Sequence, residues 1–154
     1  YFKIKSPKII LDPILRSSSN FEFHNPEQEK LVALLSKIYL LTPNFLELKK
    51  LYPNLNAEEA SRHISKNCNL YLKGGHRENK VGKDELITLE GKHFSLNPKM
   101  KGISEKHGSG CVLSSSIAAH LALDYPLLKA CFRAKRYTEK YLSSNPSLLG
   151  FHKL

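Results

Sequence analysis

Three short apolar segments alternate with helical patterns in the first half of the chain, and this order constrains the fold more than any other feature. The apolar segments are Lys8–Leu11, Ile38–Leu41 and Asn69–Lys73. Parallel strands need a long crossover connection, usually a helix, so this alternation is typical of a parallel sheet. We therefore predict an α/β fold in which helices cover both faces of a parallel sheet.

The remaining elements follow from helical periodicity and from turn residues. Asn56 is predicted to cap a helix, because Glu58 and Glu59 stand in the first turn that follows it. Glu90-Gly91 separates two segments of alternating polarity, which is typical of a hairpin. Three parallel strands alone would form a narrow sheet with an exposed edge. Helices are predicted over Glu27–Lys37, Phe45–Leu51, Ala57–Lys66, from Gly108 onward and over Pro126–Ser143, and hairpin strands over Asp84–Leu89 and Lys92–Leu96.

The charge balance narrows the choice of partner. The chain has 154 residues, enough for a single domain, and a formal net charge of +10. A positive field suits nucleic acid or a small phosphate-bearing substrate. The densest basic cluster is predicted to be a solvated helix face, so we expect no nucleic-acid partner. This cluster comprises Lys129, Arg133, Lys135, Arg136 and Lys140.

Location is predicted from hydropathy and from the cysteines. No apolar run is long enough to span a bilayer, so we expect no membrane partner. Cys68, Cys111 and Cys131 are widely spaced and form neither a disulfide framework nor a metal cluster. This usage predicts a reducing cytoplasm. Cys68 and Cys131 are interpreted as packed cysteines without chemistry.

A glycine-rich turn opens the helix that follows residue 108. Gly108, Ser109, Gly110 and Cys111 precede small and apolar residues at helical spacing. The first N–H groups of a helix have no internal partner, and glycine lets an anion approach them. The field at a helix start also favours a thiolate at Cys111. We predict an anion site with a thiol beside it, although a plain turn before a buried helix remains the alternative.

Polar residues follow each predicted parallel strand. Asp12 follows the first, Asn44 and Glu47 the second, and Lys73 the third. Ligands of such sheets bind beyond the carboxyl ends of the strands. The oxygen-bearing side chains suit Mg²⁺, which keeps several waters, and Lys73 can reach phosphates. The alternatives are a turn residue at Asp12, a helix cap at Asn44, a dipole partner at Glu47 and a surface lysine.

Taken in order, these patterns resemble the hydroxymethylpyrimidine/phosphomethylpyrimidine kinases of thiamine biosynthesis, members of the ribokinase-like superfamily. The patterns are Asp12-Pro13-Ile14-Leu15, Asn44-Phe45-Leu46-Glu47, Lys73-Gly74-Gly75-His76 and Gly108-Ser109-Gly110-Cys111. The resemblance runs from about Lys8 to the C-terminus and covers the rear part of the family. Residues 1–154 are therefore expected to be one domain, the ATP-binding and catalytic part of such a kinase.

The resemblance implies transfer of the ATP γ-phosphoryl group to hydroxymethylpyrimidine and then to its monophosphate. The turn at Gly108–Cys111 matches the anion hole of the family, in which Cys111 takes the position of the catalytic base. Most of the superfamily has aspartate there, so the cysteine favours a pyrimidine or pyridoxal-type kinase over a sugar kinase. The Gly74-Gly75 loop is expected near the nucleotide, with Lys73 on the phosphates.

The glycine-rich first unit that builds most of the acceptor pocket in the family has no match in this chain. Of the substrate contacts, only Ile14 lies where the family touches the pyrimidine ring. We therefore expect the chain to be a fragment or a truncated product. A pyridoxal-type kinase and a non-catalytic nucleotide-binding fragment remain the alternatives, and a homodimer would suit the exposed sheet edge.

Overall fold

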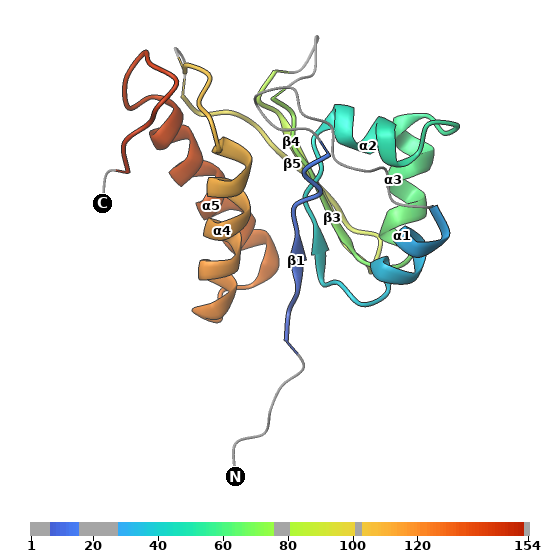
Figure 1. Ribbon diagram of the computed structural model, residues 1–154. Coiled ribbons are helices and arrows are strands. Elements are labelled where there is room, and N and C mark those ends of the chain that lie inside the picture. Colours follow the sequence, from blue (N-terminus) through green and yellow to red (C-terminus); the bar gives the residue numbers. More distant parts are fainter. Residues whose placement is uncertain (1–6, 16–27, 76–80, 101–102, 153–154) are drawn as a thin grey trace.

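The computed structural model describes residues 7–15, 28–75, 81–100 and 103–152 of the chain. They form a five-stranded mixed sheet with a group of helices on each face (Figure 1). The strands lie side by side in sequence order, from β1 to β5. The predicted α/β architecture, with helices on both faces of the sheet, is confirmed.

The first three strands are parallel, as predicted. They are β1 (Ile10–Leu11), β2 (Leu40–Leu41) and β3 (Asn69–Leu72). All residues of β2 and β3 are buried, as expected for strands that have helices on both faces. Because the three strands run in one direction, the residues that follow them meet at a single edge of the sheet.

The expectation of a narrow three-stranded sheet is wrong, because the hairpin extends it. β4 (Asp84–Ile87) pairs antiparallel with β3, and β5 (His93–Leu96) pairs antiparallel with β4. Tyr71 of β3 lies opposite Leu86 of β4, and both side chains are fully buried. This cross-strand burial covers the outer edge of β3 and leaves β5 as the second edge strand.

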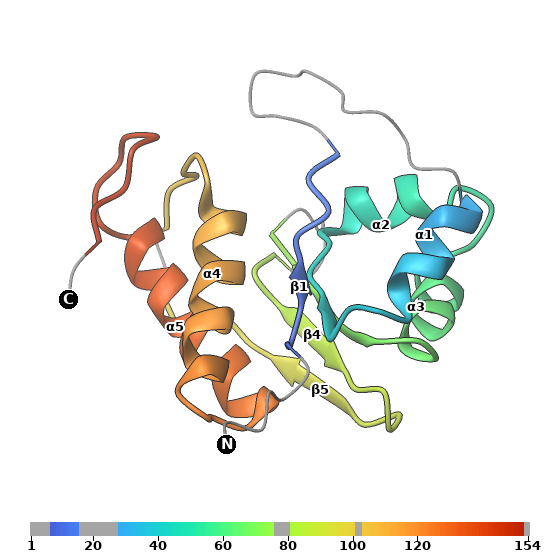
Figure 2. The ribbon, with the colours of Figure 1, turned by 60° about the horizontal axis from the view of Figure 1, so that its bottom comes forward.

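Helices separate into two groups, one on each side of the sheet. Figures 1 and 2 show α4 and α5 packed together on one side of β1 and the three shorter helices on the other. Each group buries its own apolar cluster against the sheet. Leu48, Ile64 and Leu70 belong to the first cluster, and Leu113 and Ile117 belong to the second. The bounds are α1 (Gln28–Leu35), α2 (Phe45–Leu51), α3 (Ala57–Ser65), α4 (Ser109–Ala122) and α5 (Leu127–Leu142).

Two of the short helices begin with reciprocal caps. Asn56 accepts bonds from the N–H groups of Glu58 and Glu59, which confirms the predicted cap of α3. Asn44 and Glu47 form the same kind of capping box at the start of α2. The predicted start of the first helix, at Pro26-Glu27, lies outside the described residues.

The basic cluster on α5 is not uniformly solvated. Lys129, Arg133 and Lys140 are exposed, but Lys135 is only 4% exposed. Lys135 lies on the inner face of the helix and pairs with Asp84 at 2.8 Å. The prediction of a solvated face is therefore wrong for Lys135, because an aspartate on the sheet compensates its charge.

No helix in the described part of the chain is both long and apolar enough to cross a membrane.

A narrow neck closes the connection between β3 and β4. The Gly82 N–H donates to the Gly74 carbonyl at 3.0 Å, and the Gly74 N–H donates to Asp84 Oδ1 at 2.7 Å. A Cβ atom at Gly74 would lie only 2.0 Å from the carbonyl oxygen of Lys83, whereas one at Gly75 would meet nothing within 4 Å. Glycine is thus required at the first position of the pair and not at the second.

Alanine substitutions at the two glycines should therefore differ. We expect Gly74→Ala to lower the free energy of unfolding by about 2–3 kcal/mol, because the neck must open to admit the methyl group. Gly75→Ala should stay within about 0.5 kcal/mol of the wild type. Urea unfolding monitored by circular dichroism measures both values, and equal effects would contradict the tight neck.

Candidate functional site

Three charged side chains meet at the carboxyl end of the parallel strands. Lys73 Nζ lies 2.8 Å from Asp12 Oδ1 and 3.5 Å from Glu47 Oε2. The side chains of Lys73, Asp12 and Glu47 are 13%, 11% and 13% exposed, so the cluster is largely shielded from solvent. The structure thus brings together charges that lie far apart in the sequence.

Backbone pairing beyond the strands fixes these residues. The Thr42 N–H donates to the Leu11 carbonyl, and the Lys73 N–H donates to the Pro43 carbonyl, both at 2.9 Å. Asn44 and Lys73 form an additional parallel bridge. The pairing therefore continues past β2 and β3 and sets the backbone from which Lys73 extends.

Two hydroxyl groups contact Asp12 and were not predicted from the sequence. Thr42 Oγ1 lies 3.4 Å from Asp12 Oδ1, and Ser114 Oγ lies 3.5 Å from Asp12 Oδ2, at the long end of the hydrogen-bond range. Thr42 is fully buried at the end of β2, and Ser114 lies in the second turn of α4. The position of Thr42 directly after a buried strand is the signal that could have indicated it.

The glycine-rich turn lies beside this cluster. Gly108 adopts a left-handed conformation with φ of 73°, which favours glycine, and no side chain caps the helix that it opens. A Cβ atom at Gly110 would lie 3.2 Å from Lys73 Nζ and 3.6 Å from Asp12 Oδ2. The uncapped start of α4 is therefore next to the lysine at the end of β3.

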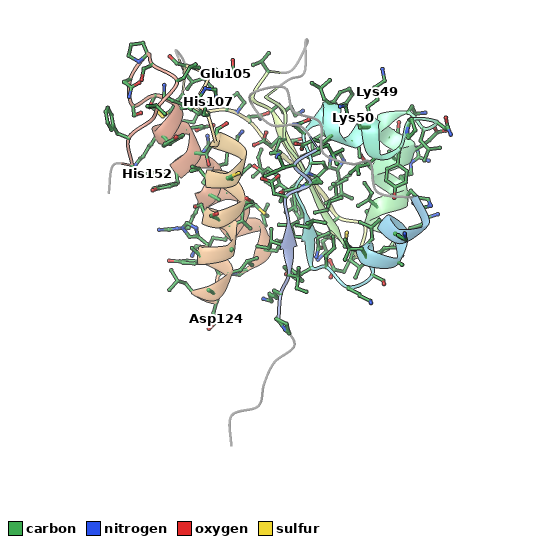
Figure 3. All side chains as sticks on the ribbon, viewed as in Figure 1. Lys49, Lys50, Glu105, His107, Asp124 and His152 are labelled. Atoms are coloured by element: carbon green, nitrogen blue, oxygen red, sulfur yellow. The ribbon has the colours of Figure 1, made fainter. Side chains whose placement is uncertain are left out.

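The orientation of α4 follows from the fold. Figure 3 shows His107 at the end of the molecule toward which β1 points and Asp124 at the opposite end. The positive end of the α4 dipole is consequently turned toward the strand ends. Unlike α2 and α3, α4 has no side-chain cap. No capping side chain therefore competes with a ligand for its first N–H groups.

A C-terminal segment supports the turn from outside. Lys106 is only 3% exposed, and its ammonium group donates to the carbonyl oxygens of Asn145 and Ser147, each at 2.6 Å. Tyr141 Oη donates to the His107 carbonyl at 3.2 Å. The residues that lead into the turn are thus bound to α5 and to the segment that follows it.

The three cysteines have different environments. Cys111 is exposed in the first turn of α4, whereas Cys68 and Cys131 are buried. Burial raises the pKa of Cys68 to about 11 and that of Cys131 to about 12. Both buried thiols therefore stay protonated near neutral pH, and the prediction that they only pack is supported.

Burial makes the charged form of the Glu47 side chain less stable. Burial raises the pKa of Glu47 above its ordinary value of 4.5, although Lys73 and the Asn44 N–H act in the opposite direction. Glu47 Oε2 accepts the bond from the Asn44 N–H at 2.6 Å, and Asn44 Oδ1 accepts one from the Glu47 N–H at 2.8 Å. The cap therefore orients the carboxylate toward Lys73.

The residues present suit one kind of magnesium site. No group of three or more His, Cys, Asp or Glu side chains that could enclose a metal is found among the described residues. Asp12 and Glu47 nevertheless offer two carboxylates next to Lys73. Mg²⁺ is commonly held by one or two carboxylates, with waters and substrate phosphates completing its shell. The donor set fits such an open site.

The other predicted site residues, Gly75 and Ile14, lie close to Lys73 and Asp12 in the chain. Gly75 is exposed at the start of the loop after β3. Ile14 follows Asp12 closely, and the residue is 45% exposed. His76 lies outside the described residues. The binding roles predicted for Gly75 and Ile14 stay predictions.

The fold is shared with ribokinase-like kinases. The solved structure of pyridoxal kinase from Staphylococcus aureus matches with a TM-score of 0.76 at 21% identity, covering 96% of this chain and 57% of that chain. The structure of phosphomethylpyrimidine kinase from Clostridium difficile matches with a TM-score of 0.65 at 25% identity, covering 86% of this chain and 56% of that one.

Sequence comparison identifies the family. The family model described as phosphomethylpyrimidine kinase matches residues 2–153, so the chain belongs to this family. A bifunctional thiamine biosynthesis protein of Methanocaldococcus jannaschii is 34% identical over 134 residues, which is 84% of this chain and 29% of that protein. A hydroxymethylpyrimidine/phosphomethylpyrimidine kinase of S. aureus is 27% identical over 150 residues, covering 90% of this chain. The chain spans 54% of the length of that kinase.

The raised pKa of Glu47 predicts a pH-dependent effect of Glu47→Gln. The folded chain binds this proton more tightly than the unfolded chain, so protonation stabilises the fold below pH 4.5 and the gain is lost as pH rises through the raised pKa. Glutamine is neutral throughout and keeps an oxygen for the Asn44 N–H. The variant should match the wild type in acid and have the higher Tm near neutral pH.

Thermal unfolding across this range tests the effect. A variant that is less stable than the wild type at neutral pH would show that the Lys73 ion pair outweighs the burial of the carboxylate.

Proposed function

We propose that this chain is the ATP-binding and catalytic part of a kinase that phosphorylates hydroxymethylpyrimidine and its monophosphate. One observation carries the proposal: the uncapped glycine-rich start of α4 lies beside Lys73 and Asp12 at the carboxyl ends of the parallel strands. Membership of the phosphomethylpyrimidine kinase family and the names of its relatives support this substrate class.

The proposed site binds phosphate through backbone and side chain together. The free N–H groups at Ser109, Gly110 and Cys111 would hold the oxygens of the transferring group. Lys73 would leave its carboxylate partners to contact the phosphates as a mobile charge. The Gly74-Gly75 turn would lie near the nucleotide, as the family resemblance implies.

Asp12 and Glu47 would hold magnesium through its waters, and Asn44 Oδ1 keeps a second lone pair for the same shell. When bound, the metal neutralises charge on the phosphates during transfer. The ion pairs of Lys73 hold both carboxylates close together. Asp12, Asn44 and Glu47 are therefore the proposed magnesium-binding residues.

The proposed chemical step places Cys111 as the base. Cys111 Sγ would accept the proton of the substrate hydroxymethyl group as the oxygen of that group forms a bond to the γ-phosphorus of ATP. The bond from the γ-phosphorus to the β,γ-bridging oxygen breaks, and ADP leaves. General base catalysis of this kind contributes about 10²–10⁴-fold to a rate.

A pyridoxal-type kinase is the second candidate, because the solved pyridoxal kinase of S. aureus shares the fold over 96% of this chain. Ile14 is the only predicted contact to the acceptor ring, so competition between pyridoxal and hydroxymethylpyrimidine would decide between them. Binding of ATP without any transfer would favour the non-catalytic alternative. The homodimer and the cytoplasmic location stay predictions.

Nucleotide binding by the chain tests the first half of the proposal. Lys73→Met should weaken binding of ATP–Mg²⁺ by about tenfold to about a hundredfold, as expected for loss of a charged hydrogen bond. Isothermal titration calorimetry gives the affinity. Lys49→Met removes the same charge from an exposed position on α2 and should change nothing.

Lys73→Arg provides a second variant, because it keeps a cation between Asp12 and Glu47 and should recover part of the affinity. Equal ATP binding by the wild type and Lys73→Met would reject the phosphate role of Lys73.

The role of Cys111 is tested by turnover. In a kinase that contains both this chain and an acceptor pocket, Cys111→Ala should lower ADP formation in the presence of hydroxymethylpyrimidine by about 10²–10⁴-fold while ATP affinity is retained. Ser115→Ala, also exposed on α4, is the matched control and should keep the wild-type rate. Unchanged turnover in Cys111→Ala would assign the base to another group, and a wild type that binds no ATP would reject the proposed function.

A further inference from the structure

A buried ion pair is hydrogen-bonded to the backbone immediately after Lys73. Asp84 at the start of β4 and Lys135 on α5 are 7% and 4% exposed, and their charged atoms are 2.8 Å apart. The pair therefore connects the sheet to the last helix. Their pairing plays no part in the proposed transfer step.

The Asp84 carboxylate accepts hydrogen bonds from three donors. Its Oδ1 accepts the Gly74 N–H at 2.7 Å, and its Oδ2 accepts Tyr71 Oη at 2.6 Å and Lys135 Nζ at 2.8 Å. Burial, together with Asp84, raises the pKa of Tyr71 well above its ordinary value, so this hydroxyl keeps its proton and donates. Hydrogen bonds from three different residues thus hold the Asp84 carboxylate in a fixed orientation.

Lys135 reaches both ends of the loop between β3 and β4. Through Asp84 it is linked to Gly74, and it donates directly to the Gly82 carbonyl at 2.6 Å. Gly74 and Gly82 are also bonded to each other at 3.0 Å. One ammonium group therefore fixes the neck of the loop against α5.

This network also fixes the backbone of Lys73. Its own N–H is bound to Pro43, and the next N–H, that of Gly74, is bound to Asp84. The peptide groups on both sides of the Lys73 Cα atom are consequently held. A buried ion pair gives little net stability compared with apolar packing. The location of this pair next to Gly74 is therefore a better guide to its role than its contribution to stability.

We propose that the Asp84–Lys135 pair is a positioning pair, which holds the Lys73–Gly74 backbone so that Lys73 and the glycine loop meet the nucleotide phosphates. The inference rests on the proposed function of the site. Neither residue touches the phosphates; both act through Gly74 and Gly82. Loss of the pair should displace Lys73 relative to the start of α4.

The test uses a double variant, because either single change leaves a buried charge without its partner. In Asp84→Asn/Lys135→Met both charges are gone, and the neck loses the hydrogen bond from Lys135 to the Gly82 carbonyl. The Tm of the double variant should be close to that of the wild type, unlike the lower Tm expected for either single variant. Affinity for ATP–Mg²⁺ should nevertheless remain weakened by about tenfold, since a small displacement of a binding group has effects of this order or larger.

A second probe separates phosphate contacts from contacts to the rest of the nucleotide. Tripolyphosphate has no base or ribose. The double variant should bind it more weakly than the wild type does, by the same factor as for ATP. Lys140→Met, at an exposed position near the end of α5, removes one positive charge and is the control for long-range electrostatics. Its affinities should equal those of the wild type.

The outcomes are distinct. Wild-type affinity in a stable double variant, or a loss for ATP without a loss for tripolyphosphate, would overturn the positioning role and leave the proposed function standing. A wild type that binds neither probe would overturn the proposed function, and this inference with it.

Discussion

The parallel pairing of β1, β2 and β3 is the constraint on which the site depends. These strands are very short, with two residues each in β1 and β2, yet their pairing brings Asp12 and Lys73 within 2.8 Å. A shift of one residue in the register would turn every side chain of the shifted strand to the other face of the sheet. The register therefore determines which charges meet at the ends of the strands.

Much of this fold could be predicted from the sequence. The parallel order follows from the alternation of apolar and helical segments, and the starts of α2 and α3 follow from Asn44 and Asn56. The joining of the hairpin to β3 was not predictable in the same way, because local polarity does not show which strand is the neighbour. Pairing partners are set by burial of residues such as Tyr71 against Leu86.

The candidate site could be predicted in part. Asp12, Glu47 and Lys73 were indicated by their positions after strands, and the structure brings them together. Lys135 was missed because it stands among exposed basic residues. Its spacing from Ala130, Cys131, Ala134 and Thr138 places it on the buried face of α5, and this periodicity was the available signal.

The cluster around Lys73 illustrates a general conflict between stability and function. Holding two carboxylates in a shielded position is unfavourable, as the raised pKa of Glu47 indicates, and Lys73 offsets only part of that cost. Such arrangements are common where ligands bind, because an arriving ligand can complete the charge balance. The neighbouring hydroxyl groups of Thr42 and Ser114 leave room for adjustment, since their contacts with Asp12 are long.

The contrast among the three cysteines has a practical consequence. Cys68 and Cys131 are buried and protonated, while Cys111 faces solvent at the start of α4. Thiol-directed reagents react with accessible thiolates, so a maleimide dye would attach at a single place in the folded chain. The native sequence thus offers a ready attachment point for a fluorescent reporter beside the glycine-rich turn, without any engineered cysteine.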